Sequence, residues 1–228
     1  MKTAIITGAS GMIGGLVLQE CLNSDYIGKV ISITRRPIGI KHDKLKEIIH
    51  HDFNNYSSIA AHFENIDIAY FCIGVYTGAV SRDEFRTITV DYTKAFAEMF
   101  KNKSPNATFC FLSGAGADQK EKSRMMFAKD KGVAENFLIN LQFSQLYIFR
   151  PAYIYPVTPR KEPNFSYKLS RKLYPLLKRI MPDGVIPSTT LAKAIFLTGL
   201  KGHKSMIIEN KAIRRIVIPN DSQNFINK

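Results

Sequence analysis

Short apolar runs rich in β-branched residues alternate along the chain with stretches whose apolar residues recur every third or fourth position. The runs predict strands and the stretches predict helices. Strands are expected at residues 4–7, 29–34, 45–50, 67–73, 108–112, 146–150 and 204–209. Helices are expected at about 13–23, 81–100, 127–135, 167–180, 190–200 and 211–217, with Ser81 and Asn210 as N-caps. This alternation indicates an α/β fold with a parallel sheet.

The first predicted strand enters a turn with glycines at positions 8, 11 and 14, and an apolar helical pattern follows. Gly8 allows a tight exit from the strand, Gly11 allows close approach to a pyrophosphate, and Gly14 lets the helix lie against the sheet. The helix N-terminus offers unpaired N–H groups to phosphate. The stretch predicts a dinucleotide site in a Rossmann-type doubly wound sheet. The alternative is a strand–turn–helix corner that uses its glycines for packing. The expected cofactor contacts in this turn are Gly8, Ala9, Ser10, Gly11, Met12 and Ile13.

The end of the second strand bears on the choice of cofactor, because it reads Thr34-Arg35-Arg36. A site specific for NAD places a carboxylate here to bond the ribose 2′-hydroxyl. No acid follows Thr34, and a guanidinium could hold a 2′-phosphate with a charge-assisted bond worth about 1.5–3 kcal/mol. The pair predicts a preference for NADP(H). The alternative is two solvated arginines before Pro37.

Later strand ends extend the predicted cofactor site, because the carboxyl ends of parallel strands border the crevice. Asp52 is expected near the adenine edge or as a cap of the next turn, and the two roles are compatible. Phe53 is expected beside the adenine ring. Cys72, Ile73 and Gly74 are expected to pass under the ribose and pyrophosphate.

The histidines and cysteines do not have the spacing of a metal site or a redox pair, so no metal is predicted. His50 and His51 are adjacent at a strand end and would point to opposite faces, and we interpret both as surface residues. Cys21, Cys72 and Cys110 lie in predicted core elements. Reduced thiols in a cytoplasmic protein are the expectation.

Four later blocks carry a more specific pattern. They read Ser113-Gly-Ala-Gly-Ala117, Phe127-Ala-Lys-Asp-Lys131-Gly-Val-Ala-Glu135, Arg150-Pro151 and Glu209-Asn-Lys-Ala-Ile213. Together with the glycine turn, they resemble the short-chain dehydrogenase/reductase superfamily over nearly the whole chain. The strongest similarity is to its atypical, epimerase-related branch of small oxidoreductase-like proteins related to the human Tat-interacting protein.

The resemblance implies an NADP(H)-dependent oxidoreductase acting on a small carbonyl or sugar-type substrate. It implies that Ser113 polarises the substrate carbonyl and that Lys131 holds the nicotinamide ribose. The family's catalytic tyrosine is replaced by Phe127, which has no O–H and cannot act as an acid or base. This replacement favours an alternative function, a non-catalytic NADP(H)-sensing or complex-assembly protein. Substitute hydroxyls are expected on loops at the crevice, at Tyr76, Tyr153 or Tyr155.

The last third of the chain is expected to complete the substrate side. Arg150, Pro151, Ala152 and Ile154 should line the nicotinamide end, with Pro151 shaping the backbone near the carboxamide by analogy with the family. The basic helix at 167–180 could be a solvated face, a surface for anionic substrates, or a partner or membrane patch. We expect one NAD(P)-binding domain over residues 1–228, with a substrate-side lobe at about 151–200.

Composition adds few constraints. The formal net charge is +13, from 32 basic and 19 acidic residues, and hydrophobic residues make up 45% of the chain. The charge would suit nucleic acid, an anionic membrane or a polyanionic cofactor, but no nucleic-acid-binding motif accompanies it. We therefore expect a small-molecule substrate and no nucleic acid. No apolar run is long enough to span a bilayer. Peripheral membrane contact and a homodimer remain open.

Overall fold

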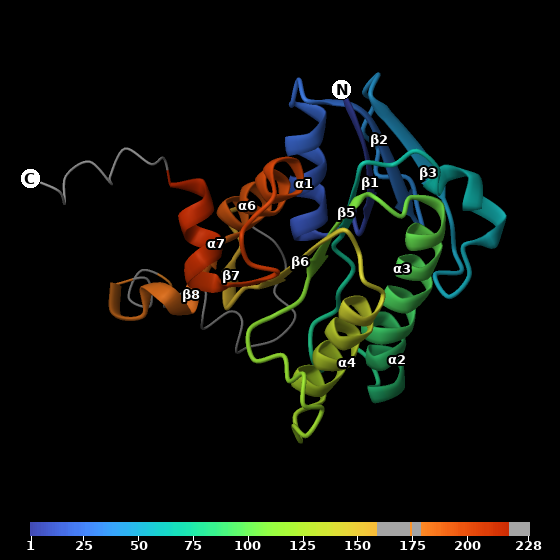
Figure 1. Cartoon of the computed structure of the whole chain (residues 1–228). Helices are drawn as coiled ribbons and strands as arrows, with labels where there is room; N and C mark the ends of the chain where they lie inside the picture. Colours follow the sequence, from blue (N-terminus) through green and yellow to red (C-terminus); the bar gives the residue numbers. More distant parts are fainter. Residues whose placement is uncertain (159–173, 175–178, 219–228) are drawn as a thin grey trace, which may run out of the picture.

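The computed structural model describes residues 1–158, 174 and 179–218 (Figure 1). Its main sheet has seven strands in the order β3-β2-β1-β4-β5-β6-β9, and every pairing is parallel. The strands are β1 (Lys2–Thr7), β2 (Ile27–Thr34), β3 (Leu45–Ile49), β4 (Ile68–Phe71), β5 (Thr108–Leu112), β6 (Gln145–Arg150) and β9 (Ile207–Glu209). The predicted α/β class and the Rossmann-type doubly wound sheet are confirmed.

Helices cover both faces of this sheet (Figure 1). One face carries α1 (Met12–Leu22), α6 (Ser188–Lys201) and α7 (Asn210–Val217). The other face carries the 3₁₀ segment η1 (Ser57–Phe63), the rod formed by α2 (Arg82–Arg86), the π segment η2 (Thr87–Asp91) and α3 (Tyr92–Lys103), and then α4 (Met126–Asn140). A second, two-stranded sheet pairs β7 (Tyr153–Tyr155) with β8 (Val185–Pro187), which follows the short 3₁₀ turn η3 (Pro182–Gly184).

The pattern of buried residues explains the layers. Side chains alternate along each strand, so Ile6 and Val30 pack toward α1, whereas Ile5 and Ile31 pack toward α3. The α3 side is rich in phenylalanine, and the ring centroids of Phe96 and Phe71 lie 5.3 Å apart. The hydrophobic effect therefore stabilises the sheet from both faces, as expected for strands that read as continuous apolar runs.

The two predicted helix caps differ in outcome. Ser81 caps the rod as predicted, because its Oγ accepts a hydrogen bond from Glu84 N at 3.2 Å. The N-cap prediction for Asn210 is wrong: Glu209 occupies that position, and Asn210 is the first helical residue. The Asn210 side chain instead accepts from Ala152 N and donates to Asp183 O and Val185 O, so it ties the residue before β7 to η3 and β8.

The surface prediction for His50 is also wrong. His50 is only 7% exposed, and its Nε2 lies 2.6 Å from Asp52 O while its ring stacks on Tyr56 at 5.2 Å. His51 is exposed as predicted. Apart from Tyr174, Arg179 and Ile180, the predicted basic helix at 167–180 lies outside the described residues. No helix in the described ranges has the length and apolar character to cross a membrane.

Candidate functional site

The glycine turn joins β1 to α1 at the point where strand order reverses, between β1 and β4. Gly8 has φ +79°, and a Cβ there would lie 2.7 Å from the Cys72 carbonyl carbon and oxygen. A Cβ on Gly14 would lie 2.2 Å from Gly8 O. Gly8 thus has its predicted role, and Gly14 lets α1 press on the turn itself. The N-cap residue Gly11 makes no side-chain cap, so backbone N–H groups at the start of α1 are available to an anion.

A cavity of about 330 Å³ opens beside this turn at the carboxyl edge of the sheet. It brings together nine residues predicted for the cofactor: Gly8, Ser10, Gly11, Thr34, Arg35, Phe53, Cys72, Ile73 and Gly74. It is also lined by six residues that were not predicted: Ile33, Val75, Val80, Glu84, Ile88 and Tyr92. Ile88 and Tyr92 belong to the apolar stripe of the predicted 81–100 helix, whose members recur at helical spacing. The start of that stripe overhangs the strand ends, which the helical period alone does not reveal.

The remaining predicted residues of the turn face elsewhere. Ala9 and Ile13 are buried in the core on the α1 side, and Met12 lines a second hollow of about 450 Å³ with Pro156 and Ser188. Asp52 is exposed and its carboxylate accepts a hydrogen bond from Asn54 N at 3.0 Å. Asp52 therefore caps the turn, the less specific of its two predicted roles.

A carboxylate that the sequence did not predict, that of Glu47 on β3, lies beside the end of β2. Thr34 is buried, while Arg35 and Arg36 are exposed. Glu47 on β3 accepts hydrogen bonds from Thr34 Oγ1 at 3.2 Å and Ile38 N at 2.9 Å. The parallel register sets Glu47 beside Ser32, two residues before Thr34. Only the pairing of β2 with β3 could have revealed this neighbour, because the two residues are far apart in sequence.

Ser113 and Arg150 belong to one buried ionic network. Ser113 Oγ donates to Glu135 Oε1 at 2.5 Å, and Glu135 is fully buried. Arg150 forms a bidentate pair with the same carboxylate, with Nη2 to Oε2 at 2.5 Å and Nε to Oε1 at 3.0 Å. Gln119 also donates to Glu135, and Arg150 Nη1 reaches the exposed Glu209 at 3.1 Å. The hydroxyl proton of Ser113 is thus already used in the hydrogen bond to Glu135. The family resemblance did not imply this bond.

Lys131 lies one turn before Glu135 on α4 and is also buried. Its Nζ donates to Leu112 O at 3.0 Å and lies 4.9 Å from the centre of the Phe111 ring. Burial lowers the pKa of Lys131 to about 8, and the Glu135 carboxylate acts against that shift. Lys131 can therefore exchange a proton near neutral pH.

The candidate hydroxyls do not converge on the cavity by the turn. Tyr76 follows β4 on a partly exposed loop, and Tyr153 and Tyr155 lie on β7; none of the three is among its described lining residues. The Tyr155 ring stacks on Tyr174 at 3.7 Å. Phe127 packs its ring tip on Gly114, where an added Cβ would lie 2.5 Å from Cζ.

The other residues predicted for the nicotinamide end lie close to one another. Pro151 O accepts from Ala115 N at 2.9 Å, which ties the segment after β6 to the segment after β5. Ala152 is held by Asn210, and Ile154 packs on the core of the α1 side. Arg150 is the last residue of β6, Pro151 and Ala152 follow it, and Ile154 lies on β7. Ser113 N donates to Phe149 O at 2.8 Å, which sets the end of β6 beside Ser113.

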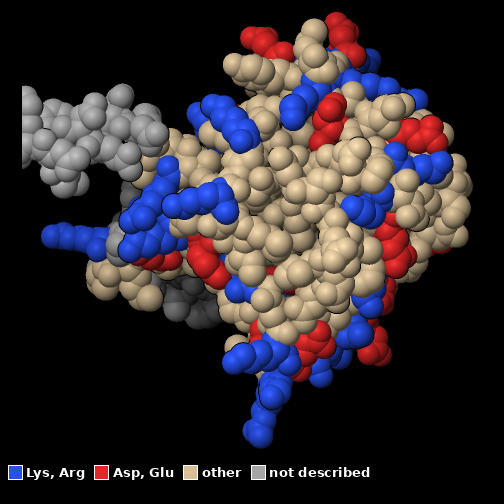
Figure 2. Space-filling model, viewed as in Figure 1, with Lys and Arg blue, Asp and Glu red and all other residues tan. Residues whose placement is uncertain are grey.

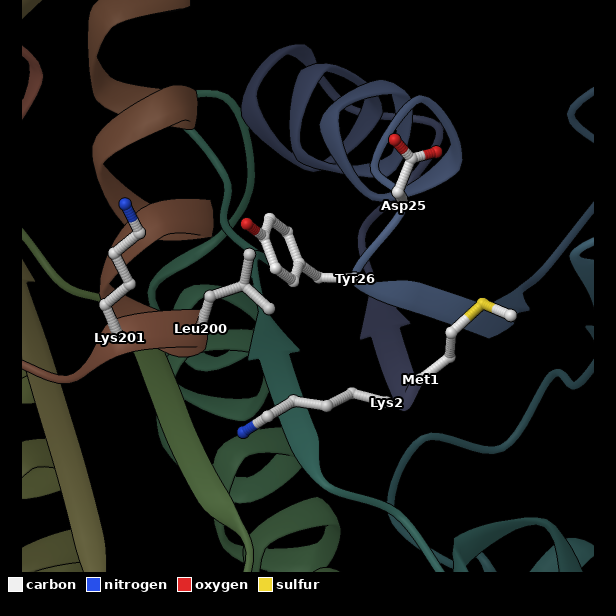
Figure 3. A pocket seen from close by; sticks show the side chains of 6 residues that line it. All are labelled: Met1, Lys2, Asp25, Tyr26, Leu200 and Lys201. Atoms are coloured by element: carbon white, nitrogen blue, oxygen red, sulfur yellow. The ribbon is translucent and has the colours of Figure 1, made fainter.

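A separate hollow of about 490 Å³ lies at the opposite, amino edge of the sheet (Figure 3). It is lined by Met1, Lys2, Asp25, Tyr26, Leu200 and Lys201. In Figure 3 the Tyr26 ring points toward Leu200. The glycine turn and the carboxyl ends of the strands lie at the other edge, around the cavity of about 330 Å³. The volume of a cavity therefore does not by itself identify the functional site. Within the described ranges, no group of three His, Cys, Asp or Glu could hold a metal.

The chain is similar to a known family and to known proteins. The model of a family described as "NAD dependent epimerase/dehydratase family" matches residues 4–129. Protein HTATIP2 of Rattus norvegicus is 28% identical over 217 residues, which cover 93% of this chain and 88% of that protein. Protein FMP52, mitochondrial, of Saccharomyces cerevisiae is 28% identical over 149 residues, covering 64% of this chain and 63% of that protein.

Solved structures show the same fold. Gre2 of Candida albicans, determined in complex with NADPH, has a TM-score of 0.70 at 16% identity, covering 91% of this chain and 77% of that one. The Bordetella bronchiseptica enzyme WbmH, determined in complex with NAD+, has a TM-score of 0.67 at 14% identity, covering 91% and 74%. At these identities the similarity concerns the fold alone.

Proposed function

The chain belongs to the NAD dependent epimerase/dehydratase family, and we propose that it is an NADP(H)-binding oxidoreductase acting on a small carbonyl or sugar-type substrate. The observation that carries the proposal is the cavity beside the glycine turn. There the ends of β1, β2 and β4 meet the uncapped N-terminus of α1, which is the place and the electrostatic environment that a dinucleotide phosphate requires.

The residues present fit such a cofactor. Backbone N–H groups at Ser10 and in the first turn of α1 would hold the pyrophosphate, whereas the N–H of Gly11 already donates to Gly8 O at 2.8 Å. The cavity wall formed by Phe53 and Tyr92, whose ring centroids are 5.6 Å apart, would receive the adenosine. The exposed Arg35, together with Arg36, would hold a 2′-phosphate. NADP(H) bound in this way would supply the hydride.

Lys131 and the segment from Pro151 to Ile154 would flank the nicotinamide end. The substrate would then lie against the proposed substrate-side lobe, residues about 151–200. The free, buried thiols of Cys21, Cys72 and Cys110 suit a reducing compartment, and we propose a cytoplasmic location.

Proton transfer is the part of the chemistry that this chain must arrange differently. Phe127 cannot donate a proton, and Ser113 already donates its own to Glu135, so Ser113 offers a ligand only its oxygen lone pairs. Lys131 has a pKa of about 8 and could hold or release a proton at the reacting oxygen. Tyr76 and Tyr153 remain the candidate hydroxyls.

Cofactor titration tests the proposal directly. We expect NADPH to bind with a dissociation constant of about 1 μM or below, and NADH to bind roughly tenfold more weakly, because one charge-assisted bond to a 2′-phosphate is worth about 1.5–3 kcal/mol. Nucleotide fluorescence measures both. Equal affinities would contradict the NADP(H) preference, and absence of binding would contradict the proposed function.

Phe127→Tyr tests whether the site is arranged for hydride chemistry. The ring tip of Phe127 lies against Gly114, so the new hydroxyl would be added beside the residue that follows Ser113. Restored proton transfer is typically worth about 10²–10⁴-fold in rate. We expect faster NADPH-dependent reduction of generic carbonyl compounds, measured by NADPH absorbance, with Phe127→Leu as the control.

The second candidate is a non-catalytic NADP(H)-sensing or complex-assembly protein. The observations that favour it are Phe127 and the committed Ser113 proton. In this case NADPH would bind, but Phe127→Tyr would leave turnover at the level of the wild type.

A further inference from the structure

Glu47 holds both ends of the short segment that follows β2. Its Oε1 atom alone accepts two hydrogen bonds, one from Thr34 Oγ1 at 3.2 Å and one from Ile38 N at 2.9 Å. Between these two anchors the chain carries Arg35, Arg36 and Pro37, all exposed. A single carboxylate oxygen therefore closes a loop whose tip is the arginine pair.

Each anchor of this loop is itself fixed. Thr34 is 3% exposed, pairs with β3 and lines the cavity beside the glycine turn. The Ile38 side chain packs on the hydrophobic core of the α1 side. Pro37 fixes its own φ and removes one donor, which further limits the conformations of the tip. The loop is thus held at the cavity rim, where Arg35 already contributes to the lining.

The carboxylate also has an electrostatic effect on the same loop. Its negative charge lies at the base of a segment with two guanidiniums and partly offsets their attraction for a phosphate. Orientation and charge act in opposite directions: the hydrogen bonds of Glu47 fix the arginines in place, while its charge weakens their field. A glutamine would keep the accepting oxygen and remove the charge, so the two effects can be separated by substitution.

We propose that Glu47 is a positioning residue for cofactor choice, which holds Arg35 and Arg36 where they distinguish a 2′-phosphate from a 2′-hydroxyl. The inference rests on the proposed function, because it concerns the same nucleotide site. It moves one determinant of cofactor choice from the end of β2, where sequence patterns locate it, to the neighbouring strand β3.

The test is the ratio of NADPH to NADH affinity in Glu47→Ala and Glu47→Gln, measured by nucleotide fluorescence. Loss of both anchoring bonds in the alanine variant should lower the ratio about five- to tenfold, mainly through weaker NADPH binding. The glutamine variant should keep or raise the ratio, because Oε1 still accepts both bonds. Asp43→Ala, at an exposed position just before β3, is the matched control for loss of one negative charge and should leave the ratio within about twofold.

The outcomes separate this inference from the proposed function. If Glu47→Ala lowers both affinities equally, or leaves the ratio unchanged, Glu47 has no positioning role, although the nucleotide site stands. A ratio that falls as far in Glu47→Gln as in Glu47→Ala would also overturn the inference. If the wild-type protein binds neither nucleotide, the proposed function and this inference both fall.

Discussion

Lys131 shows how one residue can combine opposing physical effects. Desolvation penalises its charged form, whereas the Leu112 carbonyl and the nearby Glu135 carboxylate favour it. The result is a pKa lowered from 10.5 to about 8. Below pH 8 the folded protein must carry a charge on a buried amine, which reduces the free energy of unfolding. Between pH 8 and 10.5 the unfolded chain holds a proton that the folded chain lacks, so a rise in pH stabilises the fold.

Lys131→Met should remove this pH dependence. The advantage of the variant over the wild type, measured as the difference in free energy of unfolding by urea titration, should be largest near pH 7 and should shrink as pH rises from about 8 to 10. Comparison of the two proteins at each pH cancels the contributions of other titrating groups. A constant difference across this range would show that Lys131 stays charged in the folded protein.

At the residue scale, the sequence predicted what depends on local geometry and missed what depends on contacts between distant segments. Gly8 follows from the turn alone, and its positive φ confirms the expected tight exit. His50 was misjudged because its burial comes from ring stacking on Tyr56, which lies beyond the strand. The Ser113–Glu135 bond was missed because it joins a strand end to a helix 22 residues later.

At the element scale, the Glu135–Arg150 pair connects parts of the fold that the hydrophobic pattern treats separately. Glu135 comes from α4 and Arg150 from β6, while Glu209, the second partner of Arg150, precedes α7. The Glu135 side chain is fully buried, whereas that of Glu209 is 58% exposed. The two carboxylates thus bind one guanidinium in very different dielectric surroundings. The two ion pairs should therefore contribute very different amounts to the free energy of unfolding.

Substitution of each carboxylate by alanine measures this difference. Glu135→Ala leaves Arg150 without its buried partner and should destabilise the fold by about 3–5 kcal/mol. Glu209→Ala removes an exposed partner of the same arginine and should cost at most about 1 kcal/mol. Urea denaturation reports both values. Similar losses for the two variants would show that burial does not set the strength of this network.

The elements themselves were largely predictable. Residues 108–112 read as a buried strand and form β5 with the same limits, and the 81–100 stripe forms a continuous rod with its predicted Ser81 cap. The π segment within that rod has no signature in the apolar spacing. The lining of the cavity was only partly predicted. The strand ends that line it follow from the topology of a parallel sheet, whereas the positions of Ile88 and Tyr92 over them depend on how the rod packs on the sheet.

At the scale of the whole molecule, the two edges of the sheet differ in kind. The carboxyl edge carries the glycine turn and the strand ends, and the amino edge carries the hollow around Tyr26 and Leu200. Figure 2 shows Lys and Arg side chains gathered on the side of the molecule where α7 lies. On that helix, Lys211 and Arg214 face Asp183 at 3.5 and 3.7 Å, so part of the high net charge is compensated locally.

Ligand-induced stabilisation distinguishes the two edges. NADPH at about one hundred times its dissociation constant should add about 2.7 kcal/mol to the free energy of unfolding, which raises Tm by roughly 5–10 °C for a chain of this size. Tyr26→Ala changes only the hollow at the amino edge and should leave this rise intact. A rise abolished by Tyr26→Ala would locate the nucleotide at the amino edge and refute the proposed site.

The contact between Phe127 and Gly114 has a consequence for how this protein can vary. The ring tip fills the volume that any side chain at position 114 would need. The two positions are therefore coupled: a methyl group can enter at 114 only when a smaller residue replaces the ring at 127. Libraries that diversify position 114 alone would sample mostly sterically forbidden variants, whereas paired changes that also place a smaller residue at 127 would reach compatible ones.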